Sequence, residues 1–241
     1  PFRTYINERT FEEGNPNLTP SFSHKFNLNY TLNQEYYFDF YYRDNGMYIS
    51  TLTFQDNDNF VLRDITQNVL ERTSYGFDFT YGKSITNSWY LYSYISLFHE
   101  NETFIALQSD NYSYKNDYNG AYIDLTNYVT LSNDGSFKGE LGFVYLSGWL
   151  QGSFIQEEST NLSVGLRKSF LDNRAVLSVS ANDLLGNYNS YMSSKYLNQD
   201  NRFFIKPETQ YVKFGFTYNF GNFRLEDNQR NIDKIERERL E

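Results

Sequence analysis

One short segment of the sequence places a histidine beside two carboxylates. His99 is followed by Glu100 and, two residues later, by Glu102, where an extended strand is expected to meet an outside loop. Such side chains can transfer protons in catalysis. A hydrolase would also need a nucleophile next to its base, and no residue near His99 supplies that pair at a recognisable spacing. We therefore expect no enzymatic activity and no catalytic residue.

Pairs of acidic residues are the candidates for binding a cation. They are Glu12 with Glu13, Asp56 with Asp58, and Glu157 with Glu158. Calcium needs about six to eight oxygen ligands in a fixed arrangement, and no such spacing surrounds these pairs. The absence of cysteine excludes disulfide bonds, zinc fingers and iron–sulfur clusters. We expect no metal site and no cofactor, and interpret the pairs as solvated loop residues.

Five tyrosines are candidates for ligand binding at outside loops. They are Tyr112, Tyr114, Tyr188, Tyr191 and Tyr196, and they alternate with Asn and Asp in polar stretches. Their rings have an apolar body and a polar tip, so they could stack on sugar rings or contact a peptide. Packing between loops explains them equally well, and both interpretations stay open.

The composition is rich in aromatic rings and yet hydrophilic. The 241 residues include 23 Tyr and 22 Phe, while hydrophobic residues make up 39% of the chain, and the mean hydropathy is −0.66. Most rings alternate with polar residues, which separates two faces residue by residue. The formal net charge of −9 argues against nucleic acid as a partner, because phosphates require a basic surface.

Period two is the dominant pattern, and it predicts long β-strands. The clearest example is residues 211–220, where Val212, Phe214 and Phe216 alternate with Lys213 and Gly215. Charged residues fall on the polar face in each strand: Lys25, Asp39, Arg72, Asp78, Lys138, Glu140 and Arg167. Residues 88–106 are ambiguous, because either set of alternate residues could form the apolar face. One set contains Trp89, Leu91, Ile95 and Leu97, and the other contains Tyr90, Tyr92 and Tyr94.

The pattern predicts nine strands, joined by connections of alternating length. The strands cover about residues 20–32, 35–55, 60–82, 88–106, 118–132, 136–150, 158–169, 174–183 and 208–220. Short turns rich in Asn, Asp or Gly are expected near residues 33–34, 84–87, 133–135 and 171–173. Longer polar loops are expected over 107–117, 151–158 and 184–206, with a tip at 55–60.

An antiparallel meander with short turns at one end and long loops at the other is typical of an outer-membrane β-barrel. Only helices and closed sheets can span lipid, and no run of roughly 18 apolar residues predicts a spanning helix. We therefore expect an all-β fold whose apolar face contacts lipid and whose polar face lines a lumen. A soluble β-sandwich also alternates and remains the alternative, although its strands are usually shorter, at about 5 to 6 residues.

The strand count predicts that this chain is part of a larger barrel. If the short turns are periplasmic, the chain begins outside and ends inside. Bacterial single-chain barrels usually have an even number of strands, which returns both ends of the meander to one side. The odd count therefore predicts further strands upstream.

Three segments resemble features of TonB-dependent outer-membrane receptors. Residues 15–20 (Asn-Pro-Asn-Leu-Thr-Pro), after Gly14, are similar to the entry to a late barrel strand in that family. Residues 182–185 (Asn-Asp-Leu-Leu) are similar to a segment near its C-terminus, and residues 211–220 look like the last-strand signal that the barrel-insertion machinery reads. The resemblance covers residues 12–220 and implies the C-terminal barrel portion of a receptor-like member of the outer membrane protein beta-barrel family.

One departure from the family concerns the end of the chain. The family usually ends at an aromatic residue, whereas residues 221–241 follow Phe220 here. This extension looks like the tails on outer-membrane barrels of glycan-foraging bacteria whose receptors pair with surface lipoproteins. We divide the chain into an extracellular loop entering the barrel (1–19), C-terminal barrel strands (20–220) and a charged periplasmic tail (221–241).

The resemblance implies uptake of a siderophore, glycan or peptide across the outer membrane of a Gram-negative cell. The implied partners are outer-membrane lipid, upstream barrel strands and a plug domain of the same protein, TonB through that upstream part, and a surface lipoprotein. Two other functions stay open: an outer-membrane channel or scaffold that does not use TonB, and a soluble sugar-binding β-domain.

Overall fold

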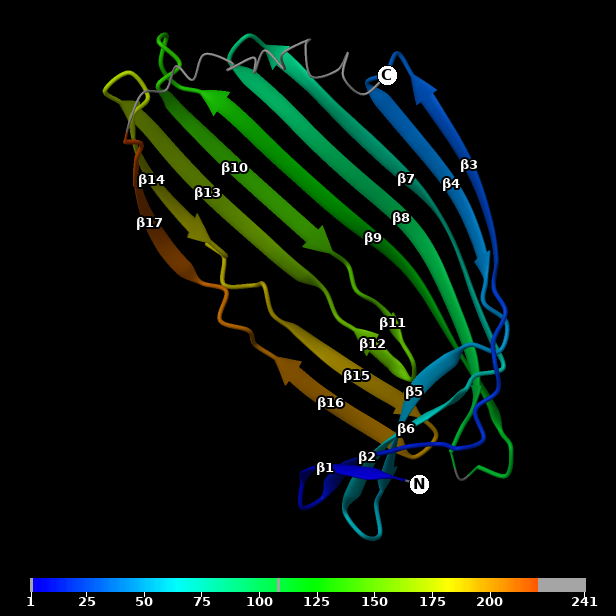
Figure 1. Ribbon diagram of the computed structural model, residues 1–241. Coiled ribbons are helices and arrows are strands. Elements are labelled where there is room, and N and C mark those ends of the chain that lie inside the picture. Colours follow the sequence, from blue (N-terminus) through cyan, green and yellow to red (C-terminus); the bar gives the residue numbers. More distant parts are fainter. Residues whose placement is uncertain (1, 108, 221–241) are drawn as a thin grey trace, which may run out of the picture.

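The computed structural model describes residues 2–107 and 109–220, and its regular elements are all β-strands (Figure 1). The seventeen strands belong to one sheet of nine strands and two sheets of four, which confirms the predicted all-β fold. Within the described residues, no helix has the length and apolar character needed to cross a membrane. The predicted tail at 221–241 lies outside the described residues.

The nine-stranded sheet is a curved wall in which every neighbouring pair of strands is antiparallel (Figure 1). In spatial order its strands are β17 (Tyr211–Tyr218), β14 (Ala175–Asn182), β13 (Ser159–Phe170), β10 (Phe137–Leu146), β9 (Ser113–Thr130), β8 (Trp89–Ile105), β7 (Glu71–Thr86), β4 (Tyr36–Asp44) and β3 (His24–Leu32). The predicted meander of about nine long strands is confirmed. The wall is not closed: β3 and β17 are its two edges within the described residues.

Short turns connect wall strands at one end, which we call the short-turn end. Asn33 and Gln34 join β3 to β4 with φ angles of 52° and 58°. Leu171, Asp172 and Asn173 join β13 to β14, also with positive φ. The turns predicted at these positions are confirmed. The turn expected near 84–87 is confined to Asn87 and Ser88, because β7 continues to Thr86 and β8 begins at Trp89.

At the opposite end, the loop end, two predicted strands are broken. The sequence predicted continuous strands over 35–55 and 60–82, whereas β5 (Ile49–Asp56) and β6 (Val61–Asn68) form a hairpin outside the wall. The chain leaves the wall after Asp44, whose Oδ1 accepts a hydrogen bond from the Gly46 amide at 2.9 Å. Gly46 has a φ of 51°, a conformation that glycine adopts without strain. Alternation continues beyond this turn, so periodicity alone could not locate it.

The remaining connections at the loop end also form strands. β1 (Arg3–Asn7) and β2 (Thr10–Glu13) join β6 and β5 in one four-stranded sheet, in which β2 and β6 are parallel. β11 (Trp149–Gln151), β12 (Phe154–Gln156), β15 (Ser190–Tyr196) and β16 (Gln199–Ile205) form the other. The long loops expected at 151–158 and 184–206 are therefore built largely of short strands.

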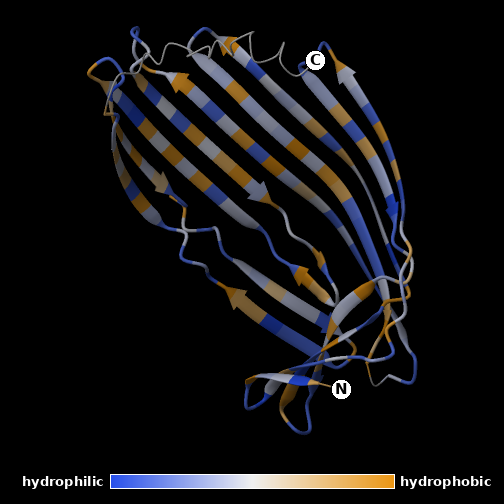
Figure 2. Ribbon diagram, viewed as in Figure 1, coloured by the Kyte–Doolittle hydropathy of each residue, from blue (hydrophilic) through white to orange (hydrophobic). Residues whose placement is uncertain are grey.

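One face of the wall is apolar across all nine strands, as the alternation predicts. Leu28, Phe40, Phe77 and Leu97 are successive register partners from β3 to β8, and Figure 2 shows hydrophobic residues recurring along each strand. We call this surface the apolar belt: Phe26, Leu28, Tyr30, Tyr36, Phe38, Phe40, Tyr42, Tyr75, Phe77, Phe79, Tyr81, Trp89, Leu91, Ile95, Leu97, Ile123, Leu125, Val129, Leu141, Phe143, Tyr145, Leu162, Val164, Leu166, Leu177, Val179, Val212, Phe214 and Phe216. Its members are exposed or half-buried, and none is buried; Leu28 is 68% exposed and Leu97 is 51% exposed.

The aromatic rings of the belt follow a fixed order on two neighbouring strands. Tyr36, Phe38, Phe40 and Tyr42 of β4 are the register partners of Tyr81, Phe79, Phe77 and Tyr75 of β7. The ring centroids of Phe40 and Phe77 are 4.9 Å apart, and those of Tyr36 and Tyr81 are 5.0 Å apart. Tyrosine at both ends with phenylalanine between is the order expected of strands that cross a bilayer, because tyrosine favours the membrane–water interface.

Polar residues bound the apolar belt at both ends. Toward the loop end, the same face carries Thr73, Asn101 and Asp117, which are register partners on β7, β8 and β9. Toward the short-turn end Lys83 forms an ion pair with Glu35 at 2.8 Å. The apolar surface is therefore a band across the wall. At the loop end the long strands continue beyond this band, and polar residues occupy the same face there.

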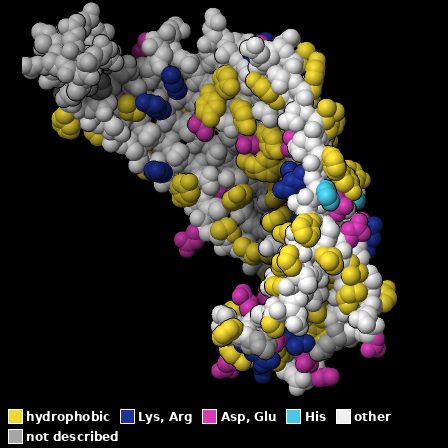
Figure 3. Space-filling view, turned by 45° about the vertical axis from the view of Figure 1, so that its right-hand side comes forward, with side chains coloured by type: hydrophobic (Ala, Val, Ile, Leu, Met, Phe, Trp, Pro, Cys, Tyr) yellow, Lys and Arg dark blue, Asp and Glu magenta, His cyan; other side chains and the backbone are white. Residues whose placement is uncertain are grey.

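The other face of the wall, which we call the polar face, is concave. It carries all seven charged residues predicted for a lumen wall: Lys25, Asp39, Arg72, Asp78, Lys138, Glu140 and Arg167. Near the short-turn end it surrounds a hollow of about 500 Å³. Figure 3 shows charged side chains distributed over the surface of the wall and at the loop end.

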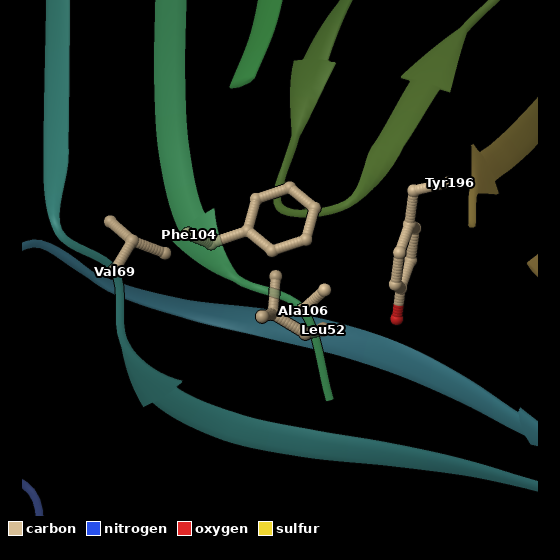
Figure 4. Close-up of a cluster of buried hydrophobic side chains, with 5 residues drawn as sticks. All are labelled: Leu52, Val69, Phe104, Ala106 and Tyr196. Atoms are coloured by element: carbon tan, nitrogen blue, oxygen red, sulfur yellow. The ribbon is translucent and has the colours of Figure 1, made fainter. Parts of the chain in front are cut away.

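The buried hydrophobic core lies at the loop end and not within the wall. Leu52, Val69, Phe104, Ala106 and Tyr196 form one cluster (Figure 4), and Leu52 and Phe104 are fully buried. Among the described residues, no second layer covers the apolar belt. The wall thus exposes its apolar side chains, while the loop end has a small core of its own.

Candidate functional site

Hairpins at the loop end are hydrogen-bonded to one another across long sequence separations. The Tyr196 hydroxyl of β15 donates to the Thr53 carbonyl oxygen of β5 at 2.6 Å. The Thr53 amide donates to Ser153 Oγ, between β11 and β12, at 3.1 Å. We call residues 45–70, 147–158 and 184–210 together the loop cap. Figure 1 shows the β15–β16 hairpin reaching from the β14 side of the wall to the β5–β6 hairpin.

Gln199 joins the two four-stranded sheets through its side chain. Its Nε2 donates to the Gln55 carbonyl oxygen at 3.0 Å, and its Oε1 accepts a hydrogen bond from the Gln55 amide. The Gln199 side chain therefore makes the two hydrogen bonds, one with the amide and one with the carbonyl of Gln55, that the backbone of a neighbouring strand would otherwise make. Gln199 is buried, with 2% of its surface exposed. Sequence reasoning missed it, because a glutamine in a polar stretch carries no distinctive signal.

Two of the five candidate tyrosines pack within or against the buried core at the loop end. The rings of Tyr114 and Tyr196 pack against Phe104, at centroid distances of 5.6 Å and 5.3 Å (Figure 4 shows Phe104 and Tyr196). Only 2% of Tyr196 is exposed, and this burial raises the pKa of its hydroxyl to about 12. The Tyr114 hydroxyl donates to the Lys195 carbonyl oxygen at 3.0 Å. These contacts give both tyrosines a structural role.

The other three candidate tyrosines lie nearer the surface. The Tyr191 ring is 4.6 Å from the Phe204 ring and 3.8 Å from the Arg202 guanidinium carbon. Tyr112 and Tyr188 are 54% and 41% exposed, and Tyr188 lines a hollow of about 260 Å³. The structure therefore does not bring the five tyrosines together at one site. Ligand binding by these residues stays a prediction, and Tyr112 and Tyr188 are the two whose exposure suits it best.

Arg72 connects the wall to the loop cap. From β7, its Nη1 lies 3.3 Å from Glu102 Oε2 and its Nη2 lies 3.6 Å from Glu100 Oε1. Nη2 also donates to the Leu150 carbonyl oxygen at 3.5 Å, and the guanidinium carbon lies 5.0 Å from the centre of the Tyr48 ring. The Glu102 side chain is fully buried, and this burial raises its pKa while Arg72 opposes the rise.

His99 lies on the opposite face of β8 from Glu100 and Glu102, because successive residues of a strand point to opposite faces. Its ring stacks on Tyr75 at 4.8 Å, at the loop end of the apolar belt. Its Nδ1 lies 2.9 Å from Asn119 Oδ1. His99, Glu100 and Glu102 are close in the sequence but therefore do not form one site.

Two of the acidic pairs considered as cation ligands, and interpreted as solvated loop residues, make contacts within the protein. Asp56 Oδ1 accepts hydrogen bonds from the Asp58 and Asn59 amides at 3.1 Å and 3.0 Å. Glu157 forms an ion pair with Arg202 at 2.9 Å. No group of three or more His, Asp or Glu residues in the described ranges is arranged to hold a metal ion.

Asp183 fixes the base of the β15–β16 hairpin. It is 2% exposed, and its Oδ1 accepts hydrogen bonds from the Asn187 and Tyr188 amides, both at 3.1 Å. Its Oδ2 accepts a hydrogen bond from the Thr209 hydroxyl at 2.7 Å. One carboxylate thus ties together the two ends of a long loop. The Asn182-Asp183 sequence was singled out only for its resemblance, and its structural role needed the fold.

The polar face also brings like charges together. Asp39 and Asp78 are register partners on β4 and β7. Each has a donor close by: Asn27 Nδ2 donates to Asp39 Oδ2 at 3.2 Å, and the Ser96 hydroxyl donates to Asp78 at 2.6 Å. The concave wall is therefore charged and hydrogen-bonded, which suits a surface in contact with water or solute rather than lipid.

Residues 1–218 match the family model described as outer membrane protein beta-barrel family. Comparisons with curated proteins and with solved structures gave no match. The matched residues include all seventeen strands, so the match covers the wall and the loop cap together.

Proposed function

This chain belongs to the outer membrane protein beta-barrel family, and we propose on that basis that it is the barrel portion of a TonB-dependent receptor in the outer membrane of a Gram-negative cell. The receptor takes up a nutrient, which is a siderophore, a glycan or a peptide. Its outside loops bind the nutrient, and the concave polar face guides it through the lumen.

The observation that carries this proposal is the division of one continuous wall into an exposed apolar belt and a charged concave face. Phe214 and Phe216 are 76% and 68% exposed, and burying such surface in hydrocarbon is favourable by about 25 cal/mol per Å². A soluble sugar-binding β-domain would leave this belt in water. The belt therefore favours a membrane barrel over that alternative.

The proposed partners follow from the same orientation. Lipid covers the belt, upstream strands of the same protein complete the wall, and a plug domain fills the lumen and carries the segment that contacts TonB. A surface lipoprotein adjoins the loop cap. The resemblance of residues 15–20 to TonB-dependent receptors supports the proposal. In the structure this segment is held before β3 by two hydrogen bonds between Thr19 and the Asn68 side chain, both 2.9 Å.

A channel that does not use TonB is the second candidate, and the hollow of about 500 Å³ on the polar face favours it. The two functions are separated with full-length protein from sarkosyl-insoluble outer membranes. A TonB-dependent receptor binds the purified periplasmic domain of TonB and shows no steady ion conductance in a planar bilayer. Conductance without TonB binding would support the channel, and recovery of the protein in the sarkosyl-soluble fraction would contradict both.

A further inference from the structure

Two positively charged side chains face each other on the polar face, and neither has an ion-pair partner among the residues that the structure describes. Lys138 of β10 and Arg167 of β13 are direct register partners, which places their Cβ atoms about 5 Å apart. Like charges at such positions destabilise a sheet. Within residues 2–107 and 109–220, none of the ion pairs includes either side chain.

Other like-charge pairs on this face have partners of their own. Asp39 and Asp78 accept hydrogen bonds from neighbouring side chains. Lys25 and Arg43 are also register partners, but the Arg43 guanidinium carbon lies 4.4 Å from the centre of the Tyr41 ring, where the ring stabilises the charge. The Lys138–Arg167 pair is thus the one of these three without such support among the described residues.

This pair borders the hollow of about 500 Å³ at the short-turn end. Gly165, Ser178 and Ser180 line the same hollow, and their small size leaves room beside the long cationic side chains. The volume lies within the range of small-molecule sites, about 300 to 1,000 Å³. The hollow is therefore large enough for an organic acid or a phosphate compound.

The charges around the hollow favour an anion. Glu140 is the one acidic residue in its lining, and it lies over Gly165, its register partner on β13. Lys213 of β17, the register partner of Ser180, adds a third cation next to the lining. Two lining cations and a third beside them outweigh one carboxylate.

We propose that Lys138 and Arg167 form an anion-binding site on the concave wall near the short-turn end, for small anions that carry carboxylate or phosphate groups. Arg167 binds two oxygens of the anion at once, as guanidinium groups do, and Lys138 supplies a point charge. Hydroxyl groups of the lining serine residues donate further hydrogen bonds. This site goes beyond the proposed function, because it does not depend on TonB.

Calorimetric titration of the full-length protein in a non-ionic detergent tests the proposal, with inorganic phosphate and citrate as separate probes. We expect saturable binding of at least one probe, and the tighter probe identifies the chemical source of the anion. The double variant Lys138→Gln/Arg167→Gln should weaken binding at least tenfold. Arg167→Lys should weaken it less, since the charge stays while the two-oxygen geometry is lost.

The matched control is Lys25→Gln/Arg43→Gln, which removes the same charge from a register pair outside the hollow and should leave affinity unchanged. Absence of saturable binding to the unaltered chain would overturn the proposal, as would equal weakening in both double variants. Folding of each variant is checked by heat-dependent migration in detergent gels. If the first double variant does not fold, unchanged affinity in both Lys138→Gln and Arg167→Lys overturns the proposal instead. A failed TonB-binding experiment would leave these outcomes unaffected.

Discussion

The Tyr196 hydroxyl donates a hydrogen bond to the Thr53 carbonyl oxygen at 2.6 Å, although the two residues are 143 positions apart in the sequence. Tyr196 belongs to the hairpin that follows β14, near one edge of the wall, whereas Thr53 belongs to the hairpin between β4 and β7, near the other. This bond therefore links loops from opposite sides of the wall into one cap.

Removing the Tyr196 hydroxyl should loosen the loop cap without unfolding the wall. Tyr196→Phe leaves the buried Thr53 carbonyl without its donor, at a cost of about 1 kcal/mol. Tyr196→Ala also leaves a cavity beside Phe104, at a cost of about 3 to 5 kcal/mol. Hydrogen exchange of the β5 and β15 amides measures both losses. Tyr188→Phe, at an exposed position, should change neither; an equal effect there would argue against a specific link.

The contribution of Tyr196 should disappear in alkaline solution. Burial raises the pKa of Tyr196 to about 12, from an ordinary value of about 10. Because the folded pKa is the higher one, the stabilisation is fully present below the unfolded value and is lost as pH rises through the folded value. The stability difference between the unaltered chain and Tyr196→Phe should shrink over this window. Denaturant unfolding of the cap, followed by Trp149 fluorescence in a Trp89→Phe background, measures it, and a constant difference would contradict the assignment.

Breaking the contacts of Arg72 should be far more costly than breaking an exposed ion pair. Arg72→Met leaves the buried Glu102 carboxylate without a counter-charge, at a cost of about 3 to 5 kcal/mol. Lys83→Met breaks the exposed pair with Glu35 and should cost at most about 1 kcal/mol. Glu102→Gln should fall between them, since an amide needs no counter-charge and Arg72 keeps Glu100. Urea unfolding in lipid vesicles ranks the three variants, and equal losses for Arg72→Met and Lys83→Met would contradict the role of Arg72.

The two tryptophans offer a test of the membrane orientation. Trp89 belongs to the apolar belt, whereas Trp149 lies in the loop cap. In vesicles of brominated lipid, fluorescence of the Trp149→Phe variant, which retains Trp89, should be quenched strongly. The Trp89→Phe variant, which retains Trp149, should be quenched weakly. The reverse order would place the belt outside the bilayer.

Substituting Asp183 should release the β15–β16 hairpin. Asp183→Ala removes the acceptor of two backbone amides and one hydroxyl, and each buried donor left unpaired costs about 1 to 3 kcal/mol. Limited proteolysis should then cut residues 184–210 first. Asp172→Ala, in an exposed turn at the other end of the wall, is the control and should leave the cleavage pattern unchanged. Protection of the hairpin in Asp183→Ala would show that other contacts hold it.

The facing of β8 illustrates where periodicity along one strand is insufficient. Both sets of alternate residues in 88–106 contain rings, so the sequence could not decide which set is apolar-facing. The register with β7 decides which set lies on the apolar face, because Phe77 and Phe79 pair with Leu97 and Ile95. Tyr90, Tyr92 and Tyr94 consequently lie on the polar face. The information lies in the neighbouring strand and not in the segment itself.

The sequence by itself determined the all-β meander, its short turns and its two-faced wall, since these depend on period-two alternation and on turn-forming residues close together in the chain. Only the tertiary structure decided that the strand leaves the wall after Asp44, that Tyr196 is buried while Tyr112 is exposed, and that Lys138 meets Arg167. Those outcomes depend on which distant segments pair and in what register, and no local pattern encodes that choice.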